Sequence, residues 1–207
     1  RPGFDHFQLM AEISDLLVAV MAAPAAQQIA YGELFQQYLA INPHTATAKE
    51  LEQVARQHID IQMHSDQCDD WLNLLIAEVI EPKLGFAAPL FIYDYPASQA
   101  ALAKVAMDAN GHAVAQRFEL YVQGIELANG YFELTDSAEQ ARRFQQEQQQ
   151  RQQLAKPVMA SDSYLLAALE SGLPECAGVA LGFDRLVMLV LQQNNISDVL
   201  SFTSDRA

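Results

Sequence analysis

The chain has 207 residues, 51% of them hydrophobic, which is enough for one sizeable core. Its formal net charge is −14, from 26 acidic and 12 basic side chains. This balance excludes a broad nucleic-acid surface, so tRNA is an unexpected partner. No stretch reaches the roughly 18 to 20 apolar residues of a membrane span, and no signal-peptide pattern opens the chain. We therefore expect a cytoplasmic protein that does not contact the membrane.

The first part of the chain is predicted to be helical. Residues 4–21 carry apolar side chains at helical spacing. Residues 31–40 and 47–58 are predicted to be two shorter helices, the second opened by a capping box of Thr47 and Glu50. Ser65 is predicted to cap a further helix that ends near residue 80. We therefore expect residues from about 25 to 64 to form a small helical insert.

Strands dominate after Pro82. Residues 90–93 are predicted to form a buried strand that ends before Pro96, and residues 115–123 and 125–134 a hairpin that turns at Gln123-Gly124. Two helices follow, over about residues 137–155 and from Ser161 or Asp162 to about 171. Helices, then antiparallel strands, then a strand–helix unit predict an α+β fold with an antiparallel sheet.

The predicted hairpin gathers acidic side chains on one face. Its turn would pair Tyr121 with Glu126 and Glu119 with Ala128, so the two carboxylates would point the same way. A bulge near residues 129–130 would add three more side chains to that face: Asn129, Tyr131 and Glu133. Crowded carboxylates call for a cation, either magnesium with nucleotide phosphates or a ligand ammonium. The simpler alternative is the polar, solvent-facing side of an ordinary hairpin.

Residues 178–185 read Gly-Val-Ala-Leu-Gly-Phe-Asp-Arg and predict a strand that turns directly into a helix. Small side chains at 178, 180 and 182 would leave one strand face open to a flat ligand. Arg185 would lie in the first helical turn, where a cation opposes the helix dipole, which favours a phosphate ligand. The alternative is close strand–helix packing beside a surface arginine.

Together these stretches resemble the class II lysyl-tRNA synthetases. Residues 117–136 are similar to the late catalytic core of that family, and residues 178–185 are similar to its motif 3. The resemblance covers essentially the whole chain. It is closer to a paralogous branch, the elongation factor P–(R)-β-lysine ligases, over residues 124–130, 174–182 and the ending 201–207. Lysyl-tRNA synthetases usually have glycine where Ala180 stands.

The resemblance implies roles for individual residues. Glu119 and Glu126 would hold magnesium and ATP and would act in catalysis together with Arg185, which would bind the γ-phosphate. Gly182 would admit the adenosine. The amino-acid pocket would be formed by Asn129, Tyr131, Ala180 and Glu133. Within it, Glu133 would pair with the side-chain ammonium of a lysine-like substrate.

The resemblance also implies an ATP-dependent ligase that works as a homodimer and transfers (R)-β-lysine to elongation factor P. It places residue 1 just after motif 2, so motifs 1 and 2 would precede this chain, and we expect residues 1–207 alone to be inactive. Two alternatives are a tRNA-charging lysyl-tRNA synthetase and a non-catalytic amino-acid-binding regulator. Ala180 opposes the first, and the retained charged residues oppose the second.

Overall fold

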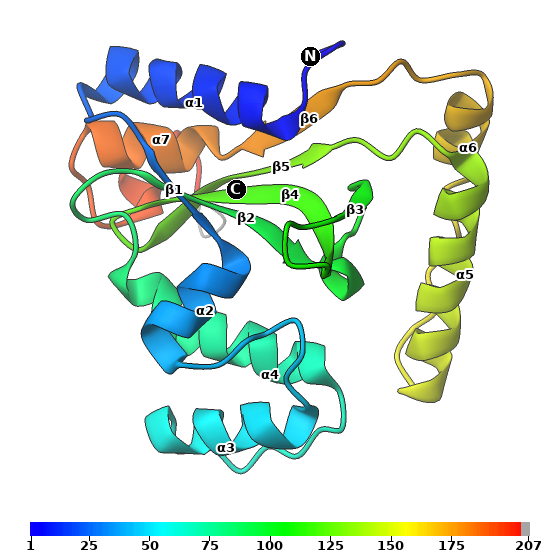
Figure 1. The fold of residues 1–207 in the computed structure, drawn as a ribbon. Helices are drawn as coiled ribbons and strands as arrows, with labels where there is room; N and C mark the ends of the chain where they lie inside the picture. Colours follow the sequence, from blue (N-terminus) through cyan, green and yellow to red (C-terminus); the bar gives the residue numbers. More distant parts are fainter. Residues whose placement is uncertain (204–207) are drawn as a thin grey trace.

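The computed structural model describes residues 1–203, which form one mixed sheet flanked by helices (Figure 1). The strands are β1 (Gln27–Ala30), β2 (Leu90–Pro96), β3 (Val105–Met107), β4 (Ala113–Val122), β5 (Ile125–Phe132) and β6 (Ala177–Leu181). Their order is β1-β2-β4-β5-β6, with β3 paired to β4 off this path. The predicted α+β fold is confirmed. The sequence did not predict β1, which lies within the expected insert and pairs parallel to β2.

Helices cover both faces of the sheet (Figure 1). One face packs against α1 (His6–Met21) and α7 (Phe183–Val190), and the other against α2 (Tyr31–Leu39) and α4 (Cys68–Leu75). The helix α3 (Ala48–His58) packs on α4, on the side away from the sheet. The helices α5 (Ser137–Gln153) and α6 (Ser163–Glu170) stand at the side. Successive strand residues point to opposite faces. Phe118 and Leu120 therefore join the α1 core, whereas Tyr121 joins the α2–α4 core.

Local capping explains where several helices begin. The predicted capping box of Thr47 and Glu50 is confirmed at α3, and Asp162 caps α6 by accepting two backbone N–H groups. The predicted cap Ser65 is wrong, because α4 begins after Gln67 and the Ser65 hydroxyl instead accepts from the Gln67 backbone. The chain then continues as a π-helix, Ile76–Ile80, and a short 3-10 helix, Glu81–Lys83.

The β4–β5 hairpin has the predicted turn but a shifted register. Tyr121 pairs with Glu126 as expected, whereas Glu119 pairs with Asn129 and not with Ala128. The bulge lies at Leu127 and not near residues 129–130, because the register shifts directly after the Tyr121–Glu126 pair. Leu127 is 1% exposed and packs into the α1 core, and this burial stabilises the bulge at Leu127.

Strand β2 extends further than predicted. It reaches Pro96 after an irregularity between Tyr93 and Tyr95, where Asp94 has a φ of 57°. None of the helices within residues 1–203 combines the length and the apolar character needed to cross a bilayer. Part of the chain ending that carries the resemblance, residues 204–207, lies outside the described residues.

Candidate functional site

Three neighbouring strands bring most of the predicted site residues together. Glu119 on β4 pairs with Asn129 on β5, which pairs with Ala180 on β6. The next row joins Arg117, Tyr131 and Gly178 in the same way. Directly paired residues share a sheet face. Phe118 and Leu120, on either side of Glu119, face α1, so both rows lie on the opposite face. The sheet itself therefore places a carboxylate, an amide and an aromatic ring side by side.

Glu119 is buried at the centre of this face and is saturated with hydrogen bonds. Its Oε1 accepts from the Arg117 guanidinium and from Asn129 Nδ2 at 3.2 Å. Its Oε2 accepts from the hydroxyls of Tyr95 and Tyr121, both at 2.7 Å. A carboxylate offers about four lone-pair sites. Four donors fill them, which offsets the cost of burying the charge.

Glu126 and Arg185 form a half-exposed pair at the edge of the site. Arg185 Nη1 donates to the backbone oxygen of Glu126 at 2.6 Å and lies 3.8 Å from its Oε2. Burial raises the pKa of Glu126, and the charge of Glu119 raises it further. A guanidinium carries five N–H donors. Most of those on Arg185 remain available to an anionic ligand.

Glu133 follows β5 and lies against Gly178. Its Oε1 is 2.1 Å from the position that a Cβ of Gly178 would occupy, so Gly178 leaves room for this carboxylate. Burial raises the pKa of Glu133, whose side chain is partly buried. Among residues 1–203, no hydrogen bond or ion pair reaches its carboxylate. The side chain is therefore available to a cationic group.

Ala180 and Gly182 border the same face. Ala180 is exposed opposite Asn129. Gly182 precedes α7 with a φ of −71°, and a Cβ there would meet Arg185 Cδ at 3.4 Å, an ordinary contact. Leu127 O would lie 3.5 Å from the same Cβ, so neither the backbone nor the protein neighbours of Gly182 require glycine.

The sequence reasoning missed four residues that organise the site. Arg117 donates to the Gln99 backbone oxygen at 3.0 Å and lies over the Tyr95 ring, 4.7 Å from its centroid. Arg117 belongs to the motif that carries the resemblance, but nothing in the sequence indicated its role. Tyr95 and Glu81 gave no local signal, because their partners in the network lie on β4. Tyr121 lies two residues from Glu119 on the same strand, but it was predicted only as the cross-strand partner of Glu126.

The two predicted metal ligands fit magnesium on one condition. No group of three or more His, Cys, Asp or Glu side chains in the described part of the chain could hold a metal ion alone. Two carboxylates suit magnesium that is also held by phosphate oxygens. Glu126 has free lone pairs for such an ion. Glu119 first has to give up one of its four hydrogen bonds.

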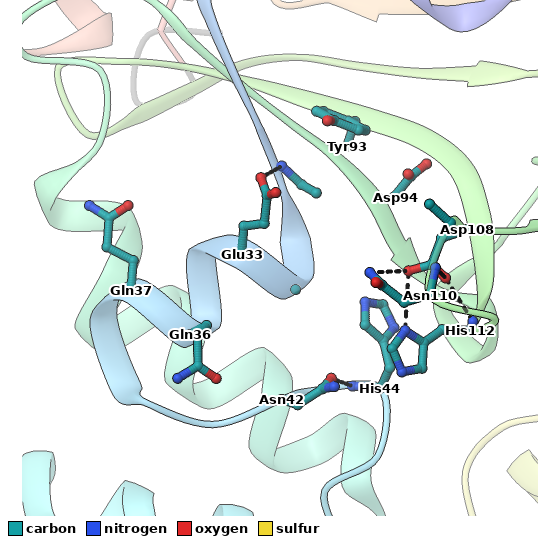
Figure 2. Close-up of a pocket in the computed structure, with 13 residues that line it drawn as sticks. Glu33, Gln36, Gln37, Asn42, His44, Tyr93, Asp94, Asp108, Asn110 and His112 are labelled. Carbon is teal, nitrogen blue, oxygen red and sulfur yellow. Dashed lines mark hydrogen bonds and ion pairs between the residues drawn. The ribbon is translucent and has the colours of Figure 1, made fainter.

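A separate cavity of about 550 Å³ lies between α2, the end of β2 and the β3–β4 connection (Figure 2). The rings of His44 and His112 stack there with centroids 5.1 Å apart, and His112 Nδ1 lies 3.1 Å from Asp108 Oδ2. None of the predicted site residues lines this cavity. The predicted site residues on the sheet face therefore lie apart from this cavity.

Curated relatives match the chain over its whole length. The match is 45% identical over 210 residues for Proteus mirabilis, 44% over 207 for Mannheimia succiniciproducens and 44% over 208 for Erwinia tasmaniensis. Each relative is named elongation factor P–(R)-beta-lysine ligase. All of this chain is covered, and it spans 63% to 64% of the relatives' own length.

The family model for class II tRNA synthetases (D, K and N) matches residues 7–206. This range contains the whole sheet and every predicted site residue. The chain belongs to the class II tRNA synthetase family of the D, K and N group.

Proposed function

We propose that this protein is an ATP-dependent ligase that activates (R)-β-lysine and transfers it to a lysine of elongation factor P. One observation carries the proposal: the partly buried carboxylate of Glu133, which no hydrogen bond or ion pair reaches within residues 1–203, shares a sheet face with the Glu126–Arg185 pair. The first suits an ammonium, and the second suits phosphates with their cation. The names of relatives at about 44% identity support the same activity.

In this proposal the amino acid lies across β5 and β6. Glu133 binds the side-chain ammonium, Tyr131 lines the pocket, and Asn129 holds the carboxylate or the second amine. The Ala180 methyl group stands opposite Asn129. It narrows the pocket floor where lysyl-tRNA synthetases usually have glycine. This suits the shifted amine of β-lysine and disfavours α-lysine.

The reaction proceeds in two steps. Arg185 binds the γ-phosphate, Gly182 admits the adenosine, and the substrate carboxylate attacks the α-phosphorus, so that pyrophosphate leaves. The lysine ε-amine of elongation factor P then attacks the acyl carbon, loses a proton and displaces AMP. Magnesium, when bound, would be held by Glu119 and Glu126 and would neutralise phosphate charge. Positioning and electrostatics supply the catalysis, and no covalent enzyme nucleophile takes part.

ATP–pyrophosphate exchange tests the activation step. The full natural chain should exchange label with (R)-β-lysine and much less with α-lysine. Residues 1–207 alone should not exchange, since they span only 63% to 64% of the length of the ligase-named relatives. Exchange by residues 1–207 would contradict that expectation. Full-length protein that binds no magnesium-ATP would favour a regulator without catalytic function.

A tRNA-charging enzyme is the alternative that the family description raises. Aminoacylation of tRNA by the full natural chain, with no transfer to elongation factor P, would support it. The net charge of −14 opposes this alternative, because a large nucleic-acid surface needs clustered basic side chains. A homodimer and a cytoplasmic location remain part of the proposal.

A further inference from the structure

A short segment after the π-helix is held tightly against the β4–β5 turn. Gln123 N donates to Gly85 O at 3.0 Å, and Gly124 N donates to Leu84 O at 2.7 Å. Gly85 has a φ of 71°, and a Cβ there would lie 2.4 Å from Tyr121 O. Only glycine permits this approach. The packing places Glu81, at the start of this segment, beside Tyr121.

Tyr121 stands between two carboxylates. Its hydroxyl oxygen lies 2.7 Å from Glu119 Oε2 and 2.9 Å from Glu81 Oε1. A phenol has one hydrogen to donate. The hydroxyl can therefore donate to only one of the two carboxylates at a time. Glu81 offers that hydrogen a second acceptor.

The second acceptor matters because Glu119 is saturated. Its Oε2 already accepts from Tyr95 and Tyr121, so neither lone-pair site of that oxygen is open to a cation. A Tyr121 hydroxyl without another acceptor would lose its hydrogen bond when Glu119 changed partner. A buried donor left without an acceptor is costly, and Tyr121 is 1% exposed.

We propose that Glu81 is a positioning residue that accepts the Tyr121 hydrogen when Glu119 Oε2 turns to a cation. Tyr121 then releases Glu119 and remains hydrogen-bonded. The π-helix directly before Glu81 is consistent with this role, since such segments are frequent at functional sites. The inference rests on the proposed function, because the cation is the one that would accompany ATP.

A double-mutant cycle tests the role. Glu81→Met removes the acceptor and keeps the side-chain length, whereas Tyr121→Phe removes the hydrogen that needs an acceptor. The readout is the affinity of the full natural chain for Mn²⁺–ATP, measured by calorimetry. Thermal unfolding of the metal-free variants checks folding. Glu78→Met, which replaces an exposed carboxylate three residues earlier, is the matched control.

We expect Glu81→Met to weaken Mn²⁺–ATP binding about tenfold in the parent and less than about twofold in the Tyr121→Phe background. Equal losses in both backgrounds, or none in the parent, would overturn the inference while leaving the proposed function standing. A parent protein that binds no Mn²⁺–ATP would contradict both the inference about Glu81 and the proposed function. If Glu81→Met does not fold, Glu81→Leu, which also removes the acceptor, carries the comparison in the same two backgrounds.

Discussion

Replacement of Glu133 by glutamine in the full natural chain should weaken binding of the lysine-like substrate. The carboxylate has no hydrogen-bond or ion-pair partner among residues 1–203, so both of its oxygens can accept from the ammonium of the substrate. A charge-assisted hydrogen bond contributes about 1.5–3 kcal/mol, which corresponds to a roughly 10- to 150-fold weaker Kd. Calorimetric titration of each variant with (R)-β-lysine measures the change.

The pH dependence of substrate binding shows whether the charge of Glu133 or only the shape of its side chain contributes to affinity. Burial raises the pKa of Glu133 above the ordinary 4.5, and only the ionised form pairs with an ammonium. Parental affinity should therefore fall as the pH drops towards this raised pKa, and the Glu133→Gln variant should lose that dependence. A carboxyl group with a raised pKa in the folded state reduces stability at higher pH. The variant should thus be at least as stable as the parent at pH 7.

Two results would refute this reasoning about Glu133. The first is unchanged substrate affinity in Glu133→Gln. The second is a loss of affinity that matches a drop in the thermal unfolding midpoint, since that would indicate a structural role. Glu170→Gln, which alters an exposed carboxylate at the end of α6, is the matched control and should change neither quantity.

Three further predictions concern other parts of the protein. Gly182→Ala should change the unfolding midpoint little, because the new methyl group would make only ordinary contacts with Arg185 and Leu127. It should weaken ATP binding about tenfold, because the methyl group would narrow the approach of the adenosine, and unchanged ATP affinity would contradict this. Ala180→Gly should raise the kcat/KM ratio of α-lysine to β-lysine in the exchange assay, and a constant ratio would remove Ala180 from the pocket. Burial lowers the pKa of His6 below 6.5, and neither ring nitrogen has a partner within the described residues. The free energy of unfolding should thus fall below pH 6.5 by up to about 1.4 kcal/mol per pH unit relative to His6→Leu, and parallel pH profiles would exclude this effect.

Local signals in the sequence predicted most of the fold. The capping box at Thr47, the apolar spacing of α1 and the turn at Gln123-Gly124 act within a few residues, so the sequence displays them directly. Strand β1 has only four residues, Gln-Gln-Ile-Ala, without the apolar alternation of a strand. It forms because Gln27 and its neighbours pair with β2, more than sixty positions away along the chain.

The sequence predicted which residues share the face of the candidate site. It did not predict the hydrogen bonds that join them. Strand alternation places Glu119, Tyr131 and Glu133 on one face whether the bulge lies at Leu127 or two residues later. Two of the four hydrogen bonds to Glu119 come from Arg117 and Tyr121 on the same strand. The other two come from Asn129 on β5 and Tyr95 on β2. The distance along the chain hides the contact with Tyr95, so no local pattern could have shown that all four acceptor sites of Glu119 are filled.

The most direct test of the central claim is the intact mass of elongation factor P after incubation with the full natural chain and ATP. With (R)-β-lysine present, the mass should increase by one β-lysyl residue, and with α-lysine the product should be much scarcer. The increase should disappear in Arg185→Ala, which removes the guanidinium beside Glu126. An unchanged mass with both amino acids, from protein that binds ATP and β-lysine, would contradict the account.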